Sequence, residues 1–202
     1  MEKSSLENIM KSPLYMPDPE ASEKAEILLE QKMQEQDSAG GVIECIVKGM
    51  PAGIGEPVFD KLDANLAKAV MSIGAVKGIE IGDGFAAAEA FGSQNNDSFC
   101  CGADGSIAKA TNHAGGILGG MSDGSDIILR AAIKPTPSIA REQQTVNREG
   151  KEIGISIKGR HDPIIVPRAV VVVEAMTAIC VLDMLLLGMT SRLDKIQSFW
   201  NR

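Results

Sequence analysis

The longest apolar segment of the chain, residues 169–187, restricts its fold more than any other feature. It is about as long as a membrane-spanning helix, which needs roughly 20 apolar residues, but it contains Glu174 and Asp183. Each acidic side chain would cost about 3 kcal/mol at the centre of a bilayer, and Gly188 follows as a helix terminator. We therefore expect a buried core helix of a soluble protein and no membrane partner.

Composition and charge exclude several classes of function. The formal net charge of −7 argues against a nucleic-acid partner, which requires a basic face. The four cysteines lack paired spacing, and the N-terminus lacks the apolar stretch of a signal peptide. We therefore expect free thiols, no metal site and a cytoplasmic location. An anionic substrate would need basic residues gathered locally. The candidates are Lys134, Arg141, Arg160 and Arg168.

Apolar periodicity and turn residues divide the chain into alternating helices and strands. Helices are predicted over residues 18–36, 59–74, 167–187 and 192–200. Strands are predicted over residues 42–48, 75–81, 127–134 and 152–158. Asp18 is placed to cap the first helix.

This order of elements mixes hairpin-like gaps with helical crossovers, so it favours an α+β layered fold over a doubly wound sheet. Residues 92–111 are rich in polar residues and glycine and are predicted to form a long loop that is functional or mobile. We expect a loose leader at residues 1–14, one domain at 15–190 and a short helical tail at 191–202.

Three groups of residues could carry chemistry, and each also has a structural interpretation. The segment Lys134-Pro135-Thr136-Pro137-Ser138 could hold a flavin or its phosphate on a stiff loop, or simply end a strand. Arg160, His161 and Asp162 could grip an anion, or form a structural Arg–Asp pair before a helix. His113 lies in a glycine-rich segment and is interpreted as a hydrogen-bonded structural residue.

Six segments of the chain resemble those of the chorismate synthase family, and they follow that family's order. They are Gly53-x-Gly55-Glu56-Pro57-Val58-Phe59-Asp60, Met71-Ser72-Ile73-Gly74-Ala75-Val76-Lys77-Gly78, Gly92-Ser93-Gln94-Asn95, Asn112-His113-Ala114-Gly115-Gly116-Ile117-Leu118-Gly119-Gly120, Lys134-Pro135-Thr136-Pro137-Ser138-Ile139 and Gly159-Arg160-His161-Asp162-Pro163. The resemblance implies a lyase of the shikimate pathway that converts 5-enolpyruvylshikimate 3-phosphate to chorismate by a 1,4-elimination of phosphate. It also implies reduced FMN as cofactor, an association with NADP, a β-α-β sandwich with helices between antiparallel sheets, and a homotetramer.

By the same resemblance, particular residues acquire roles. FMN contacts fall on Gly74, Ala75, Gly119, Lys134, Pro135, Thr136, Pro137, Ser138 and Arg160. Arg160 also meets the substrate, and Asp162 is the catalytic group that helps to remove the ring proton. Gly74 and Pro137 depart from the family, because many members carry asparagine and serine there, and each departure removes one side-chain contact to the flavin.

Other parts of the family's site have no counterpart in this sequence. The two catalytic histidines of the family lie in Gly-Glu-Ser-His-Gly-like and Ser-His-Ala-Asp-like segments, and neither occurs here. Its Arg-Ser-Ser-Ala-Arg-Glu-like segment is absent too. The resemblance therefore covers the C-terminal half of the family's domain. Three interpretations stay open: a partial or split enzyme that needs an N-terminal partner, a remnant that binds FMN or an anion without turnover, and a fragment that only supports an oligomer.

Overall fold

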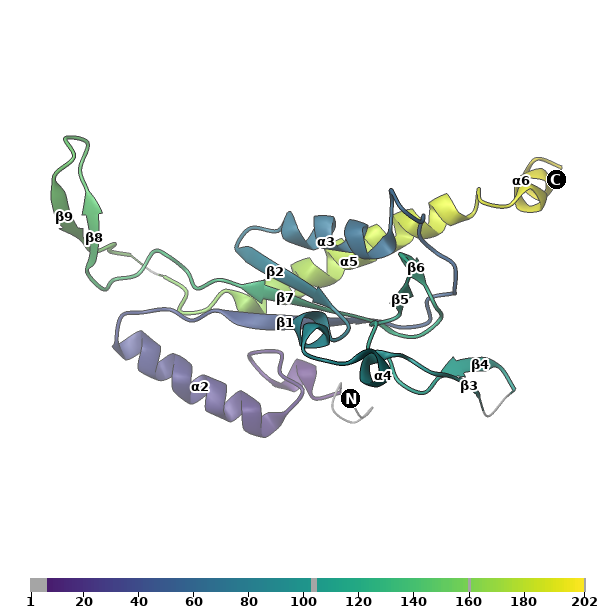
Figure 1. The fold of residues 1–202 in the computed structure, drawn as a ribbon. Coiled ribbons are helices and arrows are strands. Elements are labelled where there is room, and N and C mark those ends of the chain that lie inside the picture. The colour runs from purple at the N-terminus through teal and green to yellow at the C-terminus, as the bar shows by residue number, and fades with distance from the viewer. Residues whose placement is uncertain (1–6, 103–104, 160, 202) are drawn as a thin grey trace. The chain divides into compact units, whose positions relative to one another are not determined.

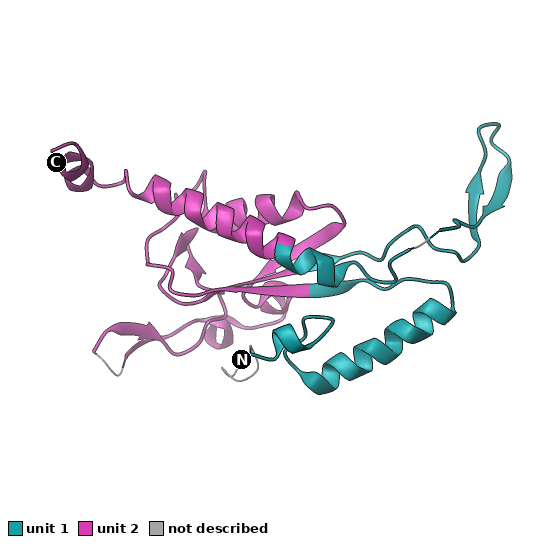
Figure 2. Ribbon diagram, turned by 180° about the vertical axis from the view of Figure 1, so that it is seen from behind, with its two compact units in different colours: residues 1–42, 132–171 teal, residues 43–131, 172–202 magenta. Residues whose placement is uncertain are grey.

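The structure is a computed structural model, and it describes residues 7–102, 105–159 and 161–201 (Figure 1). The chain forms two compact units, which are described separately (Figure 2). Unit 1 consists of residues 1–42 and 132–171, and unit 2 of residues 43–131 and 172–202. Both contain helices and antiparallel β-structure, which confirms the predicted α+β class. The predicted division into leader, domain and tail stays a prediction.

Unit 1 begins with a short 3₁₀ helix, η1 (Ile9–Lys11), and the helix α2 (Pro19–Gln34). The carboxylate of Asp18 accepts hydrogen bonds from the backbone N–H groups of Glu20 and Ala21 at 2.9 and 3.3 Å. These bonds satisfy N–H groups that the first helical turn leaves without partners, so the predicted cap is confirmed. Of α2, only Ser22 is buried, which leaves the apolar residues of this helix largely uncovered.

The rest of unit 1 contains a hairpin of which sequence patterns revealed only one strand. The strand β8 (Gln143–Val146) pairs antiparallel with β9 (Glu152–Ile155), with Gln143 opposite Ile155. The side chain of Asn147 accepts hydrogen bonds from the N–H groups of Glu149 and Lys151, both at 2.9 Å, and so stabilises the turn. β8 was not predicted because its Gln-Gln-Thr sequence carries little apolar signal.

The core of unit 2 is a sheet covered by helices. The strands are β1 (Gly41–Val47), β7 (Ile127–Ile133) and β2 (Val76–Ile81), in the order β1-β7-β2. The helices α3 (Leu62–Met71) and α5 (Val166–Gly188) lie on the same side of this sheet (Figure 1). β1, β7 and α5 each continue into unit 1 along the chain. The fully buried residues of the unit 2 core are Leu62, Leu66, Val70, Ile127, Leu129, Ala131 and Val173, and each large one stabilises the fold by roughly 1.5–3 kcal/mol.

The predicted strands and helices of unit 2 are confirmed with small shifts in their ends. The helix predicted from residue 59 begins at Leu62 instead. Phe59, at the start of the predicted helix, is 89% exposed. The reason is a tight turn in which the N–H of Glu56 donates to the carbonyl of Asp60 at 3.0 Å, so helical geometry cannot start earlier. At the other end of the unit, α6 (Leu193–Trp200) forms where a helical tail was expected.

Residues 92–102 and 105–111 contain a helix and two strands where a long loop was predicted. They form a short helix, α4 (Gly92–Asn95), and a hairpin of β3 (Phe99–Cys101) and β4 (Ile107–Lys109) in which Phe99 lies opposite Lys109. Elements of three or four residues are too short to produce a periodic apolar pattern. The remaining elements of the unit are η2 (Gly84–Ala88), β5 (Ile117–Leu118) and β6 (Met121–Ser122).

The long helix α5, predicted as a buried core helix, is buried along one face. Within unit 2 its buried residues are Val173, Thr177, Val181 and Met184. The opposite face is apolar and exposed, and it includes Val172, Ile179, Leu182 and Leu186. Among the described residues, α5 is the one helix whose length and composition would allow it to cross a membrane.

Candidate active site

The predicted flavin-binding segment, Lys134–Ser138, follows directly after β7 in unit 1. The Lys134 side chain forms no ion pair with any residue that the structure describes. The hydroxyl oxygen of Thr136 is buried and has no hydrogen-bond partner among the described residues. Pro135 and Pro137 restrict the backbone of the segment. The segment is therefore a stiff loop that carries an unpaired cation and an unsatisfied hydroxyl.

Gly40 allows the chain to pass close behind this loop. A Cβ atom at Gly40 would lie 2.5 Å from the carbonyl oxygen of Ile133 and 3.0 Å from Cδ of Pro135. Neither group can move away easily, because one is backbone and the other a proline ring. A side chain at Gly40 would therefore displace the start of the predicted flavin-binding segment.

Two consecutive residues tie the predicted flavin-binding segment to the segment of Asp162. The hydroxyl of Ser38 donates to the carbonyl of Thr136 at 2.7 Å. The N–H of Ala39 donates to the carbonyl of Pro163 at 2.8 Å, and Ala39 also pairs with Ile164 as an isolated parallel bridge. The backbone at Ser38 and Ala39 therefore holds the segments of Thr136 and Pro163 close together, although these segments lie far apart in the sequence. We call residues 134–138 together with 161–162 the Lys134 surface.

A small pocket of about 180 Å³ lies next to this surface. It is lined on one side by His161, Asp162 and Pro163, and on the other by residues around Ser38 and Ile139. A ring nitrogen of His161, Nε2, lies 3.1 Å from the carbonyl oxygen of Ile157. This bond orients the imidazole locally and agrees with the interpretation of His161 as a residue that shapes the turn.

The Asp162 carboxylate has a partner that sequence patterns did not assign to it. Nη1 of Arg168, in the first turn of α5, lies 2.7 Å from Oδ2 of Asp162, whose side chain is 34% exposed. Arg160, the partner considered from the sequence, lies outside the described residues. Among the other basic candidates, Arg141 pairs with Asp37 at 3.4 Å. The local positive charge is therefore partly neutralised, and of the three described candidates only Lys134 forms no ion pair with a described residue.

The remaining predicted flavin contacts belong to unit 2. Gly74 is exposed, and a Cβ atom there would meet nothing within 4 Å. Ala75 has a positive φ of 73°, a conformation that costs energy for a residue other than glycine and is found mostly where structure or function requires it. Gly119, with a φ of 60°, is exposed and also has open space around it. Both glycines therefore present open backbone to which a flat ring could lie close.

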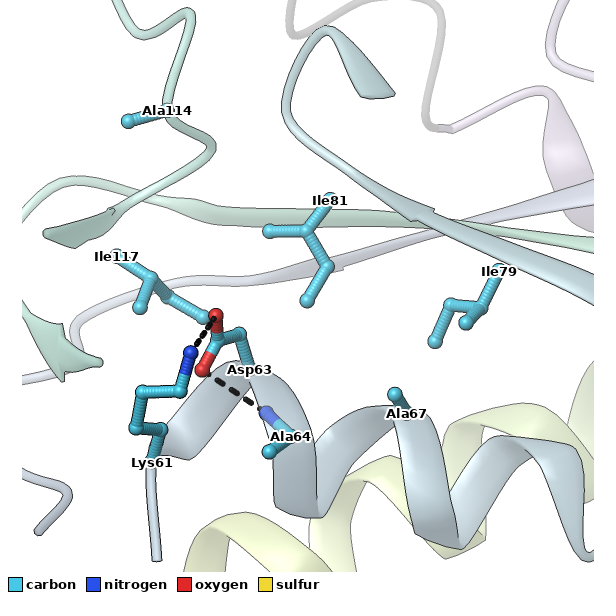
Figure 3. Close-up of a pocket in the computed structure, with 8 residues that line it drawn as sticks. All are labelled: Lys61, Asp63, Ala64, Ala67, Ile79, Ile81, Ala114 and Ile117. Atoms are coloured by element: carbon cyan, nitrogen blue, oxygen red, sulfur yellow. Dashed lines mark hydrogen bonds and ion pairs between the residues drawn. The ribbon is translucent and has the colours of Figure 1, made fainter. Parts of the chain in front are cut away.

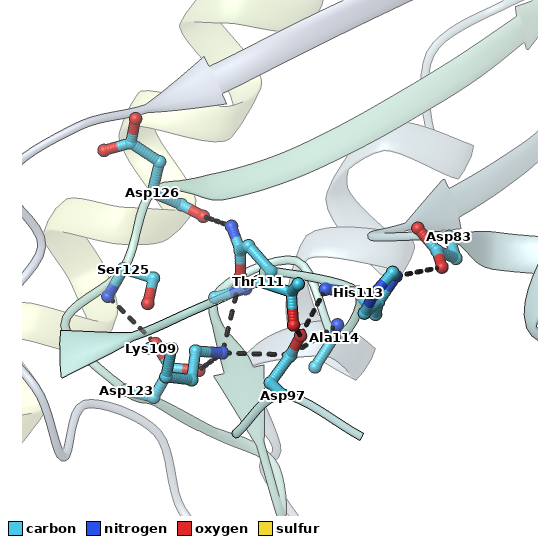
Figure 4. Close-up of polar contacts among 11 residues, drawn as sticks. Asp83, Asp97, Lys109, Thr111, His113, Ala114, Asp123, Ser125 and Asp126 are labelled. Carbon is cyan, nitrogen blue, oxygen red and sulfur yellow. Dashed lines mark hydrogen bonds and ion pairs between the residues drawn. The ribbon is translucent and has the colours of Figure 1, made fainter. Parts of the chain in front are cut away.

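The glycine-rich segment that ends at Gly120 is held by a polar cluster around the buried side chain of Lys109 (Figure 4). Lys109 is 3% exposed, and its ammonium lies 3.2 Å from Asp97 and 2.6 Å from Asp123. Asp97 also accepts hydrogen bonds from the hydroxyl of Thr111 and from the N–H groups of His113 and Ala114. We call Asp97, Lys109, Thr111 and Asp123 the Lys109 cluster.

Electrostatics inside the Lys109 cluster favour its charged form. Burial alone would raise the pKa of Asp97, but hydrogen bonds from Ala114, Thr111, His113 and Lys109 outweigh it and hold the pKa of this carboxyl far below its usual range. The pKa of Asp123 is lowered as well, because hydrogen bonds from Lys109 and Ser125 outweigh burial. The cluster was not predicted, since Asp97, Lys109 and Thr111 lie in a segment interpreted as a loop and Asp123 lies 12 residues beyond Thr111 in the sequence.

His113 extends the cluster toward the surface of unit 2. Its Nδ1 lies 2.6 Å from Oδ2 of Asp83 (Figure 4). The residue is thus hydrogen-bonded, as the structural interpretation expected. Gly82, next to Asp83, has a positive φ of 59°, and a Cβ atom there would collide with the backbone of residues 113–115. The close approach of these two loops therefore requires glycine at position 82.

A second, larger pocket of unit 2 was not predicted. It has a volume of about 440 Å³ and lies between α3 and β2 (Figure 3). Small and branched apolar side chains line it, with Lys61 and Asp63 at one end, 3.7 Å apart. The apolar lining residues are Ala64, Ala67, Ile79, Ile81, Ala114 and Ile117. Because its charges pair with each other, the pocket offers an anion no unpaired cation.

Each unit, taken by itself, contains residues that fit part of a flavin mononucleotide. In unit 1, the Lys134 ammonium and the unsatisfied Thr136 hydroxyl suit a phosphate or a ring oxygen. In unit 2, the open backbone at Gly74 and Gly119 suits a flat ring. Pockets that enclose small ligands measure about 300–1,000 Å³, whereas the pocket beside Asp162 measures about 180 Å³. This pocket is therefore too small to enclose a flavin.

Comparisons with known proteins identify the family of the chain. The sequence profile of the family described as chorismate synthase matches residues 2–186. The chorismate synthase of Lachnoclostridium phytofermentans is 64% identical over 200 residues, which are 99% of this chain and 54% of that protein. The chorismate synthase of Archaeoglobus fulgidus is 58% identical over 94% of this chain and 53% of its own length.

A solved structure extends the comparison to the fold. A crystal structure of chorismate synthase superposes with a TM-score of 0.76 at 31% sequence identity, over 98% of this chain and 52% of that one. The chain therefore belongs to the chorismate synthase family, a family of lyases. It spans about half the length of the relatives that it matches.

Proposed function

We propose that this chain provides one half of a chorismate synthase active site. In this site, 5-enolpyruvylshikimate 3-phosphate loses phosphate by a 1,4-elimination and yields chorismate. The reaction belongs to the shikimate pathway and takes place in the cytoplasm. The observation that carries the proposal is the fixed neighbourhood of the Thr136 and Asp162 segments, through the hydrogen bonds of Ser38 and Ala39. A stiff segment that carries a cation thereby lies beside a carboxylate, as proton removal next to a bound anion requires.

Each residue of the Lys134 surface has a defined role in this proposal. Reduced FMN, when bound, supplies an electron-rich ring system, and the reaction involves no net oxidation or reduction. Lys134, Thr136 and Ser138 bind the flavin with one ammonium and two hydroxyl groups, and the unsatisfied hydroxyl of Thr136 gains a partner.

Asp162 is the group that moves a proton. Its carboxylate is held by Arg168 at 2.7 Å and remains partly exposed, so it stays oriented and accessible to a substrate. Arg160 binds an anionic group of the substrate by the bidentate geometry that guanidinium groups favour. The same proposal includes a homotetrameric assembly. It also includes NADP, for the case in which the enzyme itself reduces the flavin.

The proposal requires an N-terminal half with the catalytic histidines. Proton donation by a general acid contributes about 10²–10⁴-fold to a rate, and neither histidine segment of the family occurs in this chain. The matched relatives are about twice as long as the chain. Turnover is therefore expected only in the presence of a polypeptide that carries these histidine segments.

An anaerobic turnover assay tests the proposal. The chain is incubated with reduced FMN and 5-enolpyruvylshikimate 3-phosphate, alone and with the N-terminal half of the Lachnoclostridium phytofermentans enzyme, and chorismate is followed. We expect chorismate only from the mixture. Chorismate from the chain alone would show that the histidines are dispensable. No chorismate from a mixture whose two components are folded and bound to each other would contradict the proposed activity.

A second candidate function is binding of FMN or an anion without turnover. It is favoured by the presence of Lys134, which forms no ion pair with a described residue, and by the unsatisfied Thr136 hydroxyl. This candidate predicts that FMN binds to the chain alone with the same affinity as to the mixture. A third, purely structural role predicts no FMN binding in either case.

A further inference from the structure

The pocket of about 440 Å³ between α3 and β2 has the size of a small-molecule site, since such sites measure about 300–1,000 Å³. Ala64 and Ala67 lie one helical turn apart on α3 and line one side of it. Ile79 and Ile81 point toward the helix from β2 (Figure 3). Methyl side chains on α3 leave space that larger side chains would fill. We call this pocket, whose described lining belongs entirely to unit 2, the α3–β2 pocket.

The polar end of the α3–β2 pocket carries one cation and one anion. The Lys61 ammonium lies 3.7 Å from Oδ2 of Asp63, which is longer than the roughly 2.8 Å of a close charge-assisted hydrogen bond. The two side chains are 43% and 36% exposed. Ion pairs with this degree of exposure contribute little to stability. A ligand that separates the two charges and binds each of them therefore loses little.

The backbone around the pocket fixes the positions of both charges. Gly120 has a φ of 87°, and a Cβ atom there would collide with the side chain of Lys61, so glycine leaves room for the lysine stem. The N–H of Leu62 donates to the carbonyl of Gly120 at 2.8 Å. Oδ1 of Asp63 accepts a hydrogen bond from the N–H of Ala64 at 2.9 Å (Figure 3). The ammonium and the carboxylate are therefore positioned at the pocket before a ligand binds.

We propose that the α3–β2 pocket binds a free α-amino acid with a branched aliphatic side chain, in its zwitterionic form. The carboxylate of the ligand pairs with the Lys61 ammonium, and its ammonium pairs with the Asp63 carboxylate. The side chain of the ligand lies against the apolar walls. The two charged groups of an α-amino acid are attached to one carbon atom, which suits two protein charges that lie side by side. No residue of the Lys134 surface takes part, so the proposal does not depend on the proposed function.

The chemistry of the lining selects this class of ligand. A ligand with a single charge would break the Lys61–Asp63 pair and satisfy only one of its members. A phosphate ester would bring its negative charge close to Asp63. An uncharged apolar ligand would leave the polar end without a contact. The described lining contains no aromatic side chain on which a flat ring could stack, and its isoleucines and alanines suit an aliphatic side chain.

The test is a titration of the full chain with L-leucine, followed by amide NMR. We expect saturable shifts at Ala64, Ala67 and Ile79, with a dissociation constant of about 1 mM or less. 4-Methylpentanoate lacks the ammonium group of leucine, and 3-methylbutylamine lacks its carboxylate. Each should bind about tenfold more weakly, because one charge-assisted contact is lost. Glycine should also bind about tenfold more weakly, because it buries no apolar side chain.

Two variants alter the two ends of the pocket separately. Lys61→Gln should weaken L-leucine binding by about tenfold and remove the preference for L-leucine over 3-methylbutylamine, since only the Asp63 contact remains. Ala67→Leu should abolish saturable binding, because the larger side chain fills the pocket. Lys68→Gln and Ala88→Leu are the matched controls, since both positions are exposed and lie outside the pocket. They should bind L-leucine within about twofold of the parent.

Several results would overturn the inference. One is the absence of saturable shifts at these amides in the parent chain. Another is binding of 4-methylpentanoate or 3-methylbutylamine to the parent as tightly as L-leucine, which would exclude a site for a zwitterion. Unchanged binding in Lys61→Gln would remove the cation from the site, and this result stands even if Ala67→Leu fails to fold. Loss of L-leucine binding in a complex with the N-terminal half of the Lachnoclostridium phytofermentans enzyme would show that this half covers the pocket.

Discussion

The Lys109 cluster and the Lys134 surface both place a lysine near hydroxyl and carboxylate groups, but only the first satisfies them within the chain. Lys109 is buried with two carboxylates, and Asp97 accepts four hydrogen bonds. Lys134 forms no ion pair with a described residue, and the Thr136 hydroxyl is unsatisfied. Buried polar groups are normally paired, so a complete cluster indicates a structural role and an incomplete one indicates a place where something else binds.

The largest expected effect lies at the edge of the Lys134 surface. Asp162→Asn should lower turnover of the chain combined with its N-terminal half by about 10²–10⁴-fold, because the carboxylate that moves the proton is lost. FMN affinity should be unchanged, since no flavin contact is removed. Steady-state kinetics and a flavin titration measure both. Wild-type turnover in this variant would remove Asp162 from the mechanism.

The second prediction breaks the Lys109 cluster. Lys109→Met should lower the free energy of unfolding by about 3–5 kcal/mol, because it leaves two buried carboxylates without their counter-charge. Lys24→Met is the control, since Lys24 pairs with Glu20 in an exposed ion pair and should cost less than about 1 kcal/mol. Urea denaturation of both variants measures the difference. Similar losses in the two variants would contradict a structural role for the cluster.

The third prediction concerns pH. The pKa of Asp97 is lowered in the folded chain, so its contribution to stability is fully present above the unfolded pKa of about 4. That contribution is lost as the pH falls through the lower folded pKa, because the unfolded state then binds more protons. Asp97→Asn should flatten the fall in stability between about pH 4 and pH 2, as measured by urea denaturation at several pH values. An unchanged slope would assign the acid sensitivity to other carboxyl groups.

The fourth prediction concerns the unpaired cation. Lys134→Ala should weaken FMN binding by about tenfold, which corresponds to the loss of one charge-assisted hydrogen bond of about 1.4 kcal/mol. The stability of the chain without FMN should not change, because Lys134 has no ion-pair partner to lose among the described residues. Anaerobic fluorescence titration of FMN measures the affinity, with Lys24→Ala as a control. Equal affinities in all three proteins would exclude Lys134 from the flavin site.

The smallest expected effect compares two threonines directly. Thr111→Val should destabilise the chain by about 1–2 kcal/mol, because Asp97 loses a hydrogen bond of 2.7 Å. Thr136→Val should be within about 0.5 kcal/mol of the parent or slightly more stable, because its hydroxyl has no partner to lose. Thermal unfolding of both variants without FMN measures the two changes in stability. A larger loss at Thr136 would mean that its hydroxyl is structural.

Sequence patterns predicted the elements that depend on local chemistry or on continuous periodicity. The Asp18 cap, the buried face of α3 at Leu62, Leu66 and Val70, and the long helix α5 were found in this way. Short elements were not, because the three or four residues of β3, β4 and β8 are too few to show a period. Their pairing depends on partners elsewhere in the chain.

Sequence patterns predicted the separate segments of the candidate site, but they did not predict which of these segments contact one another. The position of Lys134–Ser138 after a strand followed from its prolines and from the family resemblance. The bonds from Ser38 and Ala39, and the pairing of Asp162 with Arg168, are contacts between distant parts of the chain. The uncovered side of α5 could not be predicted either. A continuous apolar sequence does not show whether one face or both faces of the helix are covered by neighbours.

The most direct test of the contrast between the two lysine sites is an anaerobic titration of the chain with reduced FMN, combined with its N-terminal half and followed by amide NMR. We predict that the amide signals of Lys134, Thr136 and Ser138 shift with a common affinity, while those of Lys109 and Thr111 do not. Shifts at Lys109 and Thr111 without shifts at the Lys134 surface would contradict the account, because the satisfied cluster would then be the binding site.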